Sequence, residues 1–310
     1  MLKPQHSGLY FTQSHIEHAQ THADQEPFAG AWAYLRSHEK TGSAAAVWGG
    51  LRYRFSDHAA AGSMAVALLQ RHIDPTLIEG MTDFDAIAET LMLAQAFEMV
   101  RDHPDFADSA RAAWLRLFER RVGALNDRAH SGAYHAYLWL VTLNFAAGVV
   151  LERDALIDEA TAAFKQVIAA EVRPQGFITQ AVEPGDGLGL YRQILAAAAL
   201  VLTAEAARHI GLDLWNYAVR GVSVVTAALY PIYYFYTTDK WQWDEAVSVE
   251  DAQGYFRAHG GFLEMVNQHA PHRDLKTLLA DLRPIGDVRG GGLTTLTHGT
   301  LEKKRRGLFG

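Results

Sequence analysis

The apolar residues of this chain recur at intervals of three and four positions along most of its length. Segments such as AAGSMAVALLQR, AIAETLMLAQAFEMV, YLWLVTLNFAAGVVL and ILAAAALVLTAEAARHI show this spacing, and alanine is abundant in them. This period is that of an amphipathic α-helix, and small side chains let neighbouring helices pack closely. Because alternating patterns typical of strands are scarce, the sequence predicts an all-α protein.

Short stretches rich in Gly, Pro, Asp and His separate the helical segments, among them RDHPDFAD and RPQGFITQAVEPGDGLG. The segments form hairpins of about 35 to 45 residues, close to the period of stacked helix pairs. Several hairpins have a long loop at one end and a tight turn at the other. We therefore expect an (α/α)n toroid or incomplete barrel of roughly six hairpins, with the long loops at one rim. Residues 1–310 are predicted to form a single domain, with a non-helical segment from about Arg283.

The overall charge and the residue content exclude several classes of protein. The formal net charge is −7, whereas a phosphate backbone attracts a basic surface, so nucleic acid is not an expected partner. The basic run EKKRRGLFG at the C-terminus is interpreted as a solvated tail. The chain has no cysteine, which excludes disulfides, thiolate metal sites and cysteine nucleophiles. We expect no apolar stretch to reach the ~18 residues of a membrane span, so no membrane partner is predicted.

Hydrogen-bonding side chains crowd the stretch NDRAHSGAYHAYLW, which runs directly into an apolar helical segment. These side chains are Asn126, Arg128, His130, Tyr134, His135 and Tyr137. We expect the first three in a loop and His135 in the first helical turn. The positive end of a helix dipole attracts an anion, so this arrangement favours a site for a negatively charged ligand. The alternative is a hydrogen-bonded core histidine beside exposed loop residues and packed aromatic rings.

The order of the segments resembles that of the alginate lyase superfamily, polysaccharide lyases built on an α/α toroid. YRFSDHAAAGSMAVALL is similar to an early hairpin of that family, and YHAYLW followed by LERDALIDEA to its Asn-His-x-Tyr-Trp helix. GFITQAVEPGDGLGLYRQILAAAALVLTAE resembles its next active-site segment. GGFLEMVNQHAP and LRPIGDVRGGGLTTLTHG resemble its C-terminal segments. The resemblance covers most of the chain.

The resemblance puts His135 at the family's catalytic histidine and Tyr137 at the tyrosine two places later. Tyr134 and Leu138 stand where the family has asparagine and tryptophan.

The family's next segment holds an arginine and, seven residues on, a catalytic tyrosine. Ungapped alignment puts Gly187 and Ile194 at these two positions. Tyr191 and Arg192 lie close by, and they would take these roles after a shift of a few residues. The alternative for Tyr191 is packing alone.

The activity that the resemblance implies is β-elimination on a 4-linked polyuronate, either alginate or glucuronan. Arg, His or Asn neutralises the carboxylate next to C5, Tyr or His removes the C5 proton, and Tyr protonates the leaving O4. The catalytic candidates are His135, Tyr191, Arg192 and His130, and the candidate substrate ligands in the same region are Asn126, Arg128, Tyr134 and Tyr137. Such a reaction requires no metal or organic cofactor, and its partner is an acidic polysaccharide.

The N-terminus MLKPQHSGLYFTQSHIEHAQ does not have the pattern of a signal peptide. Because a signal is removed on export, a periplasmic or secreted location is expected, with a cytoplasmic one as the alternative.

The most aromatic stretch is YPIYYFYTTDKWQWDE. Sugar rings stack on aromatic faces and a nearby cation attracts a uronate, so Tyr234, Lys240 and Trp241 are further candidate substrate ligands. The alternative is a corner of the core. The glycine run of RGGGLTTLTHG lacks the Lys-Ser/Thr ending of a phosphate loop. The His, Asp and Glu residues show no spacing typical of a metal site, so none is predicted.

Two other functions are compatible with this sequence. A glycoside hydrolase on the same toroid would need two facing carboxylates, for which Asp83, Glu183, Asp186 and Asp244 are the candidates. A non-catalytic toroid that binds a polysaccharide is the other alternative, because the family's arginine and tyrosine are not at their aligned positions.

Overall fold

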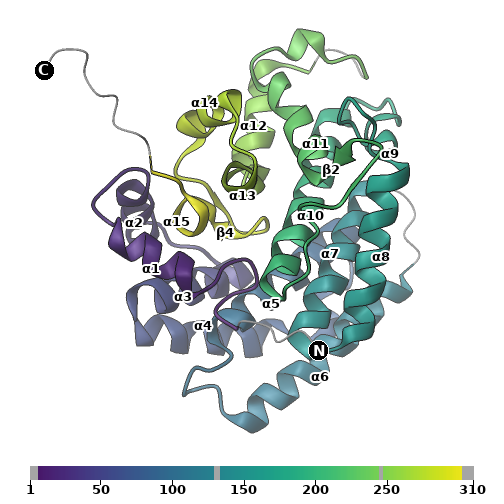
Figure 1. The fold of residues 1–310 in the computed structure, drawn as a ribbon. Helices are drawn as coiled ribbons and strands as arrows, with labels where there is room; N and C mark the ends of the chain where they lie inside the picture. Colours follow the sequence, from purple (N-terminus) through teal and green to yellow (C-terminus); the bar gives the residue numbers. More distant parts are fainter. Residues whose placement is uncertain (1–5, 129–132, 244–246, 302–310) are drawn as a thin grey trace, which may run out of the picture.

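The computed structural model describes residues 6–128, 133–243 and 247–301, and most of them are helical (Figure 1). The α-helices are α1 (Gln13–Thr21), α2 (Phe28–Ser37), α3 (Gly42–Ser56), α4 (Ala59–His72), α5 (Asp83–Val100), α6 (Asp108–Asp127), α7 (Tyr134–Leu151), α8 (Asp154–Ala170), α9 (Thr179–Val182), α10 (Gly189–His209), α11 (Val224–Leu229), α12 (Val249–His259), α13 (Phe262–His269), α14 (Arg273–Leu282) and α15 (Thr294–His298). The 3₁₀-helices are η1 (Pro75–Ile78), η2 (Tyr230–Phe235) and η3 (Thr238–Lys240). The strands form two antiparallel pairs, β1 (Ala218–Val219) with β2 (Val222–Ser223) and β3 (Gly286–Asp287) with β4 (Gly292–Leu293).

Helices α3, α5, α7 and α10 form an inner layer, in which each packs against the next. Nearly all residues of α5, α7 and α10 are buried, as expected of helices that are apolar on all sides. Helices α4, α6 and α8 pack outside them and bury one face only. Each inner helix of the first three hairpins is therefore followed by an outer helix, which is the alternation expected of helical hairpins.

The inner helices α7 and α10 run parallel in a fixed register. Trp139 Nε1 donates to the carbonyl oxygen of Leu195 at 2.9 Å, and Thr142 Oγ1 donates to that of Ala199 at 3.0 Å. Phe84 at the start of α5 packs edge to face on Trp139, with ring centroids 5.3 Å apart. The N-terminal turns of α5, α7 and α10 consequently lie at the same end of the layer.

Small residues allow the close approach of these helices. A Cβ atom added at Gly148 of α7 would lie 2.6 Å from Cγ1 of Ile157 in α8, and one at Gly50 of α3 would lie 2.9 Å from Cβ of Met99 in α5. Both distances are too short for non-bonded carbon atoms. The glycines therefore set the spacing of the hairpin partners and of the inner layer.

The C-terminal segment returns to the N-terminal helices. The β3–β4 pair leads into the short helix α15, which packs against α1, α2 and α13, so that the last helix lies beside the first (Figure 1). The sequence predicted that this segment, from about Arg283, is not helical. Its last turn is helical, however, because Thr294–His298 are buried and their backbone groups need partners there.

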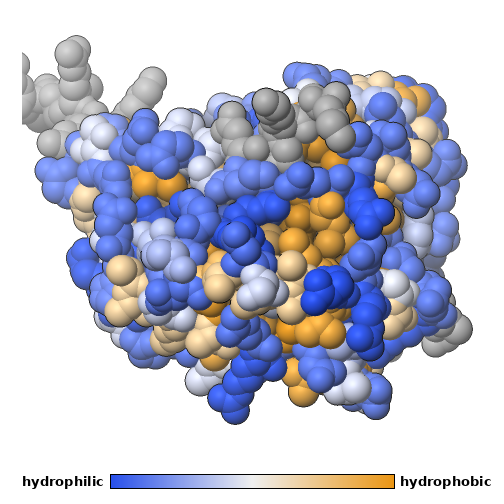
Figure 2. Space-filling view, turned by 90° about the horizontal axis from the view of Figure 1, so that it is seen from below, coloured by the Kyte–Doolittle hydropathy of each residue, from blue (hydrophilic) through white to orange (hydrophobic). Residues whose placement is uncertain are grey.

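Helices α7 and α10 are long and apolar enough to cross a membrane by length and composition, contrary to the expectation that no stretch is. In the fold 78% and 89% of these windows are buried against other protein elements, as in the core helices of a folded domain. Seen from below, the surface is mainly hydrophilic around a smaller area of exposed apolar side chains (Figure 2).

Candidate active site

A cleft of about 730 Å³ opens where the N-terminal turns of α5, α7 and α10 meet. Helix N-termini carry unpaired N–H groups and the positive end of the helix dipole, so their convergence favours an anionic ligand. The loop between β3 and β4 adds Arg289 to the lining. The complete lining is Thr82, Asp83, Phe84, Asp85, Ala133, Tyr134, His135, Ala136, Tyr137, Gln180, Tyr191 and Arg289.

His135 is the second residue of α7 and lies in the first helical turn, as the sequence indicated. It is 7% exposed, and its ring meets that of Phe84 edge to face with centroids 5.2 Å apart. Within the described residues its Nδ1 has no hydrogen-bond partner. Burial, followed by the positive charges of Arg192 and His259, lowers its pKa to about 4. The ring is therefore neutral at neutral pH and able to accept a proton.

Tyr191 is the third residue of α10, and its ring centroid lies 6.1 Å from that of His135. Tyr255 and His259 of α12 pack on its other side, with centroids 5.2 Å and 5.5 Å away. Burial raises the pKa of the Tyr191 hydroxyl, and the positive charge of Arg289 opposes this only in part. The phenol is consequently protonated at neutral pH and can donate a proton to a ligand.

Arg289 is the cation in the described lining of the cleft, and it was not among the residues predicted from the sequence. Its Nη2 lies 3.1 Å from Oδ1 of Asp85, and its guanidinium lies over the Phe84 ring at 5.6 Å. The backbone N–H of Gly290 donates to Oδ1 of Asp287 at 2.9 Å, and a Cβ at Gly290 would lie 2.2 Å from Oδ2 of that carboxylate. A side chain at position 290 would displace this carboxylate, and Gly291 and Gly292 have φ values of 106° and 86°, which favour glycine. A cation directly before a glycine run is thus the signal that RGGG carries in the sequence.

Arg192 adjoins Tyr191 but does not line the cleft. Its Nη1 donates to Oδ1 of Asp186 at 2.6 Å, and its Nη2 also pairs with that carboxylate. This hydrogen bond, opposed in part by burial, lowers the pKa of Asp186. The pair closes the turn before α10, where the N–H of Leu188 also bonds to Asp186 at 3.2 Å. Arg192 therefore influences His135 through its charge.

Asn126 lies in the last turn of α6, not in a loop as expected. Its side-chain amide exchanges two hydrogen bonds with that of Asn144 in α7, both 2.9 Å long. Arg128 follows the helix, donates to the carbonyl oxygen of Ile78 at 2.8 Å and lies 3.6 Å from Oδ1 of Asp83. Of these two, only Arg128 contacts a residue of the cleft lining. The predicted His130 lies outside the described residues.

Tyr134 and Tyr137 both line the cleft, as a substrate role would require. Their rings are tilted by 34° with centroids 5.7 Å apart, and Tyr137 is 39% exposed. Sugar rings pack on such exposed aromatic faces.

Tyr234, Lys240 and Trp241 are not in the cleft lining. Tyr234 and Trp241 are buried and pack edge to face with centroids 4.8 Å apart, and the Tyr234 hydroxyl donates to that of Tyr230 at 3.2 Å. Lys240 is exposed, with Nζ 3.4 Å from Asp239. For the two rings the arrangement agrees with the alternative interpretation, a corner of the core.

The carboxylates of the lining are Asp83 and Asp85, which share the first turn of α5. Thr82 caps this turn, because its Oγ1 accepts a hydrogen bond from the N–H of Asp85 at 3.1 Å. Glu183 and Asp186 are exposed and lie outside the lining, and Asp244 falls outside the described residues. The described lining thus offers carboxylates from one wall only, whereas hydrolysis needs a pair on opposite sides of the sugar.

Comparison with known proteins identifies the family. The alginate lyase family profile matches residues 59–243. No curated protein matches the sequence significantly. Among solved structures, a histidine-to-alanine variant of alginate lyase A1-III complexed with a tetrasaccharide superposes with a TM-score of 0.73 at 14% identity, covering 97% of each chain. A tyrosine-to-phenylalanine variant of the same enzyme with a tetrasaccharide has a TM-score of 0.73 at 15% identity, over 90% of this chain and 79% of that one.

A1-III comes from Sphingomonas species A1. An alginate lyase from Bacteroides ovatus has a TM-score of 0.62 at 17% identity, over 84% of this chain and 73% of that one. These similarities confirm the predicted α/α toroid. Because the family profile covers more than half of its residues, the chain belongs to the alginate lyase family, a family of polysaccharide lyases.

Proposed function

We propose that this polysaccharide lyase cleaves a 4-linked polyuronate of the alginate class by β-elimination. The observation that carries the proposal is the meeting of His135 and Tyr191 in one cleft wall, with ring centroids 6.1 Å apart. A neutral imidazole and a protonated phenol are the two groups that such a reaction needs, and both face a cleft at the positive ends of helices.

In the proposed reaction, the neutral ring of His135 takes the proton from C5 of the uronate. The C5–H electrons form the C4–C5 double bond as the C4–O4 bond breaks, and the hydroxyl of Tyr191 gives its proton to O4. His135 is left protonated and Tyr191 ionised, and a proton exchanged with solvent restores both. The step needs no oxidant or reductant.

Arg289 is proposed to bind the carboxylate at C6 of the sugar. The C5 proton is only weakly acidic, and a cation beside the carboxylate stabilises the charge that develops when the proton leaves. The Arg289 side chain is 36% exposed in its pair with Asp85, so its guanidinium can exchange this partner for the substrate. It would replace the family arginine that the alignment does not find. Gln180, also in the lining, is proposed to donate a hydrogen bond to the same sugar.

Tyr134 and Tyr137 are proposed to pack against a neighbouring sugar of the chain. Two solved neighbours of similar fold hold a tetrasaccharide, and they carry a tyrosine or a histidine substitution. This supports an extended binding site of several sugars. Glucuronan, a 4-linked polymer of glucuronate, is the alternative substrate of the same class.

The test is the appearance of the absorbance of the new C4–C5 double bond. Polymannuronate, polyguluronate and glucuronan are each incubated with the purified protein, with a neutral mannan as control. We expect unsaturated product from at least one polyuronate and none from the mannan. His135→Ala and Tyr191→Phe should each slow its formation at least ~100-fold, whereas Tyr233→Phe, at an exposed residue outside the cleft lining, should leave it unchanged.

Two results would reject the proposal. New reducing ends without unsaturation would indicate hydrolysis. Binding of a polyuronate by the folded protein, with no product from any of the three polymers, would indicate a non-catalytic binding protein.

A further inference from the structure

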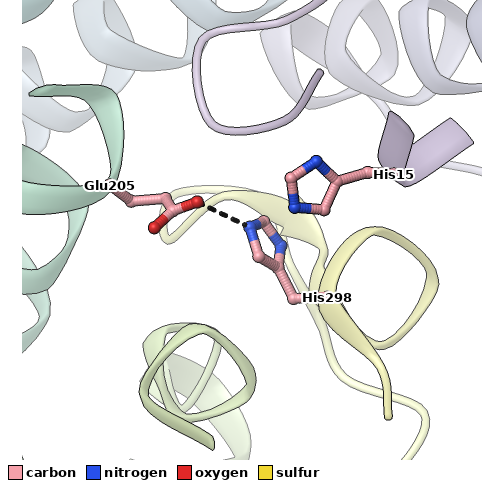
Figure 3. A group of neighbouring side chains, drawn as sticks. All are labelled: His15, Glu205 and His298. Atoms are coloured by element: carbon pink, nitrogen blue, oxygen red, sulfur yellow. Dashed lines mark hydrogen bonds and ion pairs between the residues drawn. The ribbon is translucent and has the colours of Figure 1, made fainter. Parts of the chain in front are cut away.

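A second cluster of titratable side chains lies far from the cleft, around Glu205 near the C-terminal end of α10. Fourteen residues separate it from Tyr191 on the same helix, which at 1.5 Å per residue is roughly 21 Å. The Glu205 side chain is fully buried. Its neighbours come from α1, α10, α13 and α15, so the cluster joins both ends of the described chain to the central helix (Figure 3).

The carboxylate of Glu205 has more nitrogen neighbours than it can accept hydrogen bonds from. Six nitrogen atoms lie within 3.3 Å of its oxygens, namely Nε and Nη2 of Arg208, Nε1 of Trp215, and Nε2 of His209, His269 and His298. A carboxylate offers about four lone-pair sites. About two of the six nitrogens are therefore in excess of what a hydrogen-bonded carboxylate needs.

Two of the surrounding histidines have their rings oriented by a threonine. Thr12 holds Nδ1 of His15 through its hydroxyl at 3.0 Å and its backbone N–H at 3.1 Å, and the Thr297 hydroxyl lies 2.7 Å from Nδ1 of His298. In both cases Nε2 faces the cluster. A metal-binding histidine usually donates its other ring N–H to such a partner, and the Thr297 hydroxyl can accept it from Nδ1 of His298. Nδ1 of His15 instead accepts the backbone N–H of Thr12, so binding a metal through Nε2 would require the proton to move to Nδ1, where the Thr12 hydroxyl can accept it.

A cationic group already lies among these atoms. Nη2 of Arg208 contacts the Glu205 carboxylate and lies 3.1 Å from Nε2 of His209 and 3.4 Å from Nε2 of His15. The Arg208 side chain is 37% exposed and lines a cavity of about 400 Å³ together with Trp215 and His269. The guanidinium can therefore move into this cavity, which also provides a route from solvent to Glu205.

We propose that His15, Glu205 and His298 bind a divalent transition-metal ion of the Zn²⁺ class, with His209 as the fourth ligand, in place of the guanidinium. The candidate ligand atoms of the first three residues lie within 4.8 Å of one another. Oε1 of Glu205 is 3.1 Å from Nε2 of His209 and 3.3 Å from Nε2 of His298. Ligand atoms of a tetrahedral zinc site are about 3.4 Å apart, and imidazole with carboxylate is a ligand set that zinc accepts.

The proposed role is structural. A site with protein ligands at all four positions leaves no place for substrate, and it lies away from the cleft. The ion would hold α1 and α15 against α10. Without it, the two short helices α1 and α15 would be held there by packing alone. Metal binding should therefore raise the melting temperature, since an ion that binds only the folded chain stabilises it.

The test uses the full-length protein after dialysis against a chelator. ZnCl₂ is titrated in by calorimetry, and the melting temperature is recorded with and without one equivalent of Zn²⁺. We expect one tight site per chain and a higher melting temperature. Co²⁺ in its place should give the intense visible bands of tetrahedral coordination. His298→Ala should weaken Zn²⁺ binding at least ~100-fold, since loss of a supporting partner alone can weaken it that much.

Two further variants decide the proposal even if His298→Ala folds poorly. Arg208→Met removes the competing guanidinium and should tighten Zn²⁺ binding. His18→Ala is the matched control and should leave the tight site unchanged, because His18 is an exposed residue of α1, the helix that also holds His15, and its ring packs on that of His22.

Either of two outcomes would overturn the proposal. One is that neither the wild type nor Arg208→Met binds Zn²⁺ stoichiometrically, which would make Glu205 a carboxylate held by Arg208 and hydrogen bonds alone. The other is that binding disappears in His18→Ala. All these readouts are independent of lyase activity.

Discussion

The rings of His135 and Tyr191 meet edge to face, at an angle of 71° and with centroids 6.1 Å apart, although they belong to different helices. The contact exists because α7 and α10 run parallel and are held in register by Trp139 and Thr142. Each residue lies in the first turn of its helix, so the parallel arrangement brings both to the same end. The structure therefore brings a group that can accept a proton, His135, and one that can donate a proton, Tyr191, into a single cleft.

Removal of the Tyr191 hydroxyl should affect the chemical step and not substrate binding. We expect Tyr191→Phe to lower kcat at least ~100-fold, the lower range for loss of a general acid, with KM nearly unchanged. Tyr255→Phe is the matched control, because this ring packs on Tyr191 but lies outside the cleft lining. Steady-state kinetics on a polyuronate would check this. Equal losses in the two variants would mean that the hydroxyl of Tyr191 has no special role.

Removal of the Arg289 charge should weaken recognition of the sugar carboxylate. We expect Arg289→Gln to lower kcat/KM on a polyuronate by ~10- to 100-fold, and Arg289→Lys to recover part of it, because lysine keeps the charge but not the planar fork. Arg153→Gln, at an exposed arginine paired with Glu119, serves as control.

A methyl-esterified polyuronate gives a sharper measure of the same residue. The ester has no negative charge for Arg289 to bind, so the wild type should prefer the acid form more strongly than Arg289→Gln does. An unchanged preference in this variant would contradict the assigned role.

The sequence predicted the helical toroid and the position of His135, because both follow from local patterns. The helical period can be recognised in each segment separately. A histidine in the first helical turn after a polar stretch can likewise be recognised from the local sequence. Arg289 was missed because its contact with the start of α5 depends on the path of the β3–β4 turn. The Glu205 cluster was missed for the same reason, since His15 and His298 come from opposite ends of the chain. Asn126 was misplaced because its helix continues to Asp127.

The pH dependence of activity should reflect the low pKa of His135. A general base must be unprotonated, so kcat/KM should fall on the acid side with a midpoint near the pKa of about 4, below the ordinary 6.5. Arg192 is one cause of this lowering, after burial, and Arg192→Gln removes its positive charge. The pKa of His135, and with it the acid limb, should then move upward. A pH–rate profile that does not move in this variant would contradict the electrostatic link.

The same shift has a consequence for stability. Because the pKa of folded His135 is below that of the unfolded chain, the unfolded state binds the proton first as the pH falls. The stabilising contribution of neutral His135 to the free energy of unfolding is thus fully present above about pH 6.5. It is lost as the pH falls from about 6.5 to about 4. Chemical denaturation at pH 7 and pH 5 should show a smaller decrease for His135→Gln than for the wild type.

Arg121 should be a strong stability determinant with no part in catalysis. It is fully buried, donating to Oγ1 of Thr90 at 2.9 Å and to the carbonyl oxygen of His72 at 2.7 Å, and so it ties α6 to α5 and α4. Arg121→Met keeps much of the volume but leaves both acceptors without this donor. We expect a loss of about 1–3 kcal/mol in the free energy of unfolding, measured by denaturant titration. The exposed neighbour Arg120→Met should change it by less than about 0.5 kcal/mol.

Substitution of Asn126 distinguishes two roles. The structure indicates that its amide joins α6 to α7, whereas the sequence predicted that it binds substrate. Its amide exchanges two hydrogen bonds with Asn144, so Asn126→Ala should lower the free energy of unfolding by about 1 kcal/mol and leave KM within about twofold. Asn144→Ala should cost a similar amount. The loss of unfolding free energy in the double variant should be smaller than the sum of the two single losses, because either change alone already breaks the pair. A large rise in KM on a polyuronate, without loss of stability, would instead support the predicted role of Asn126 in substrate binding.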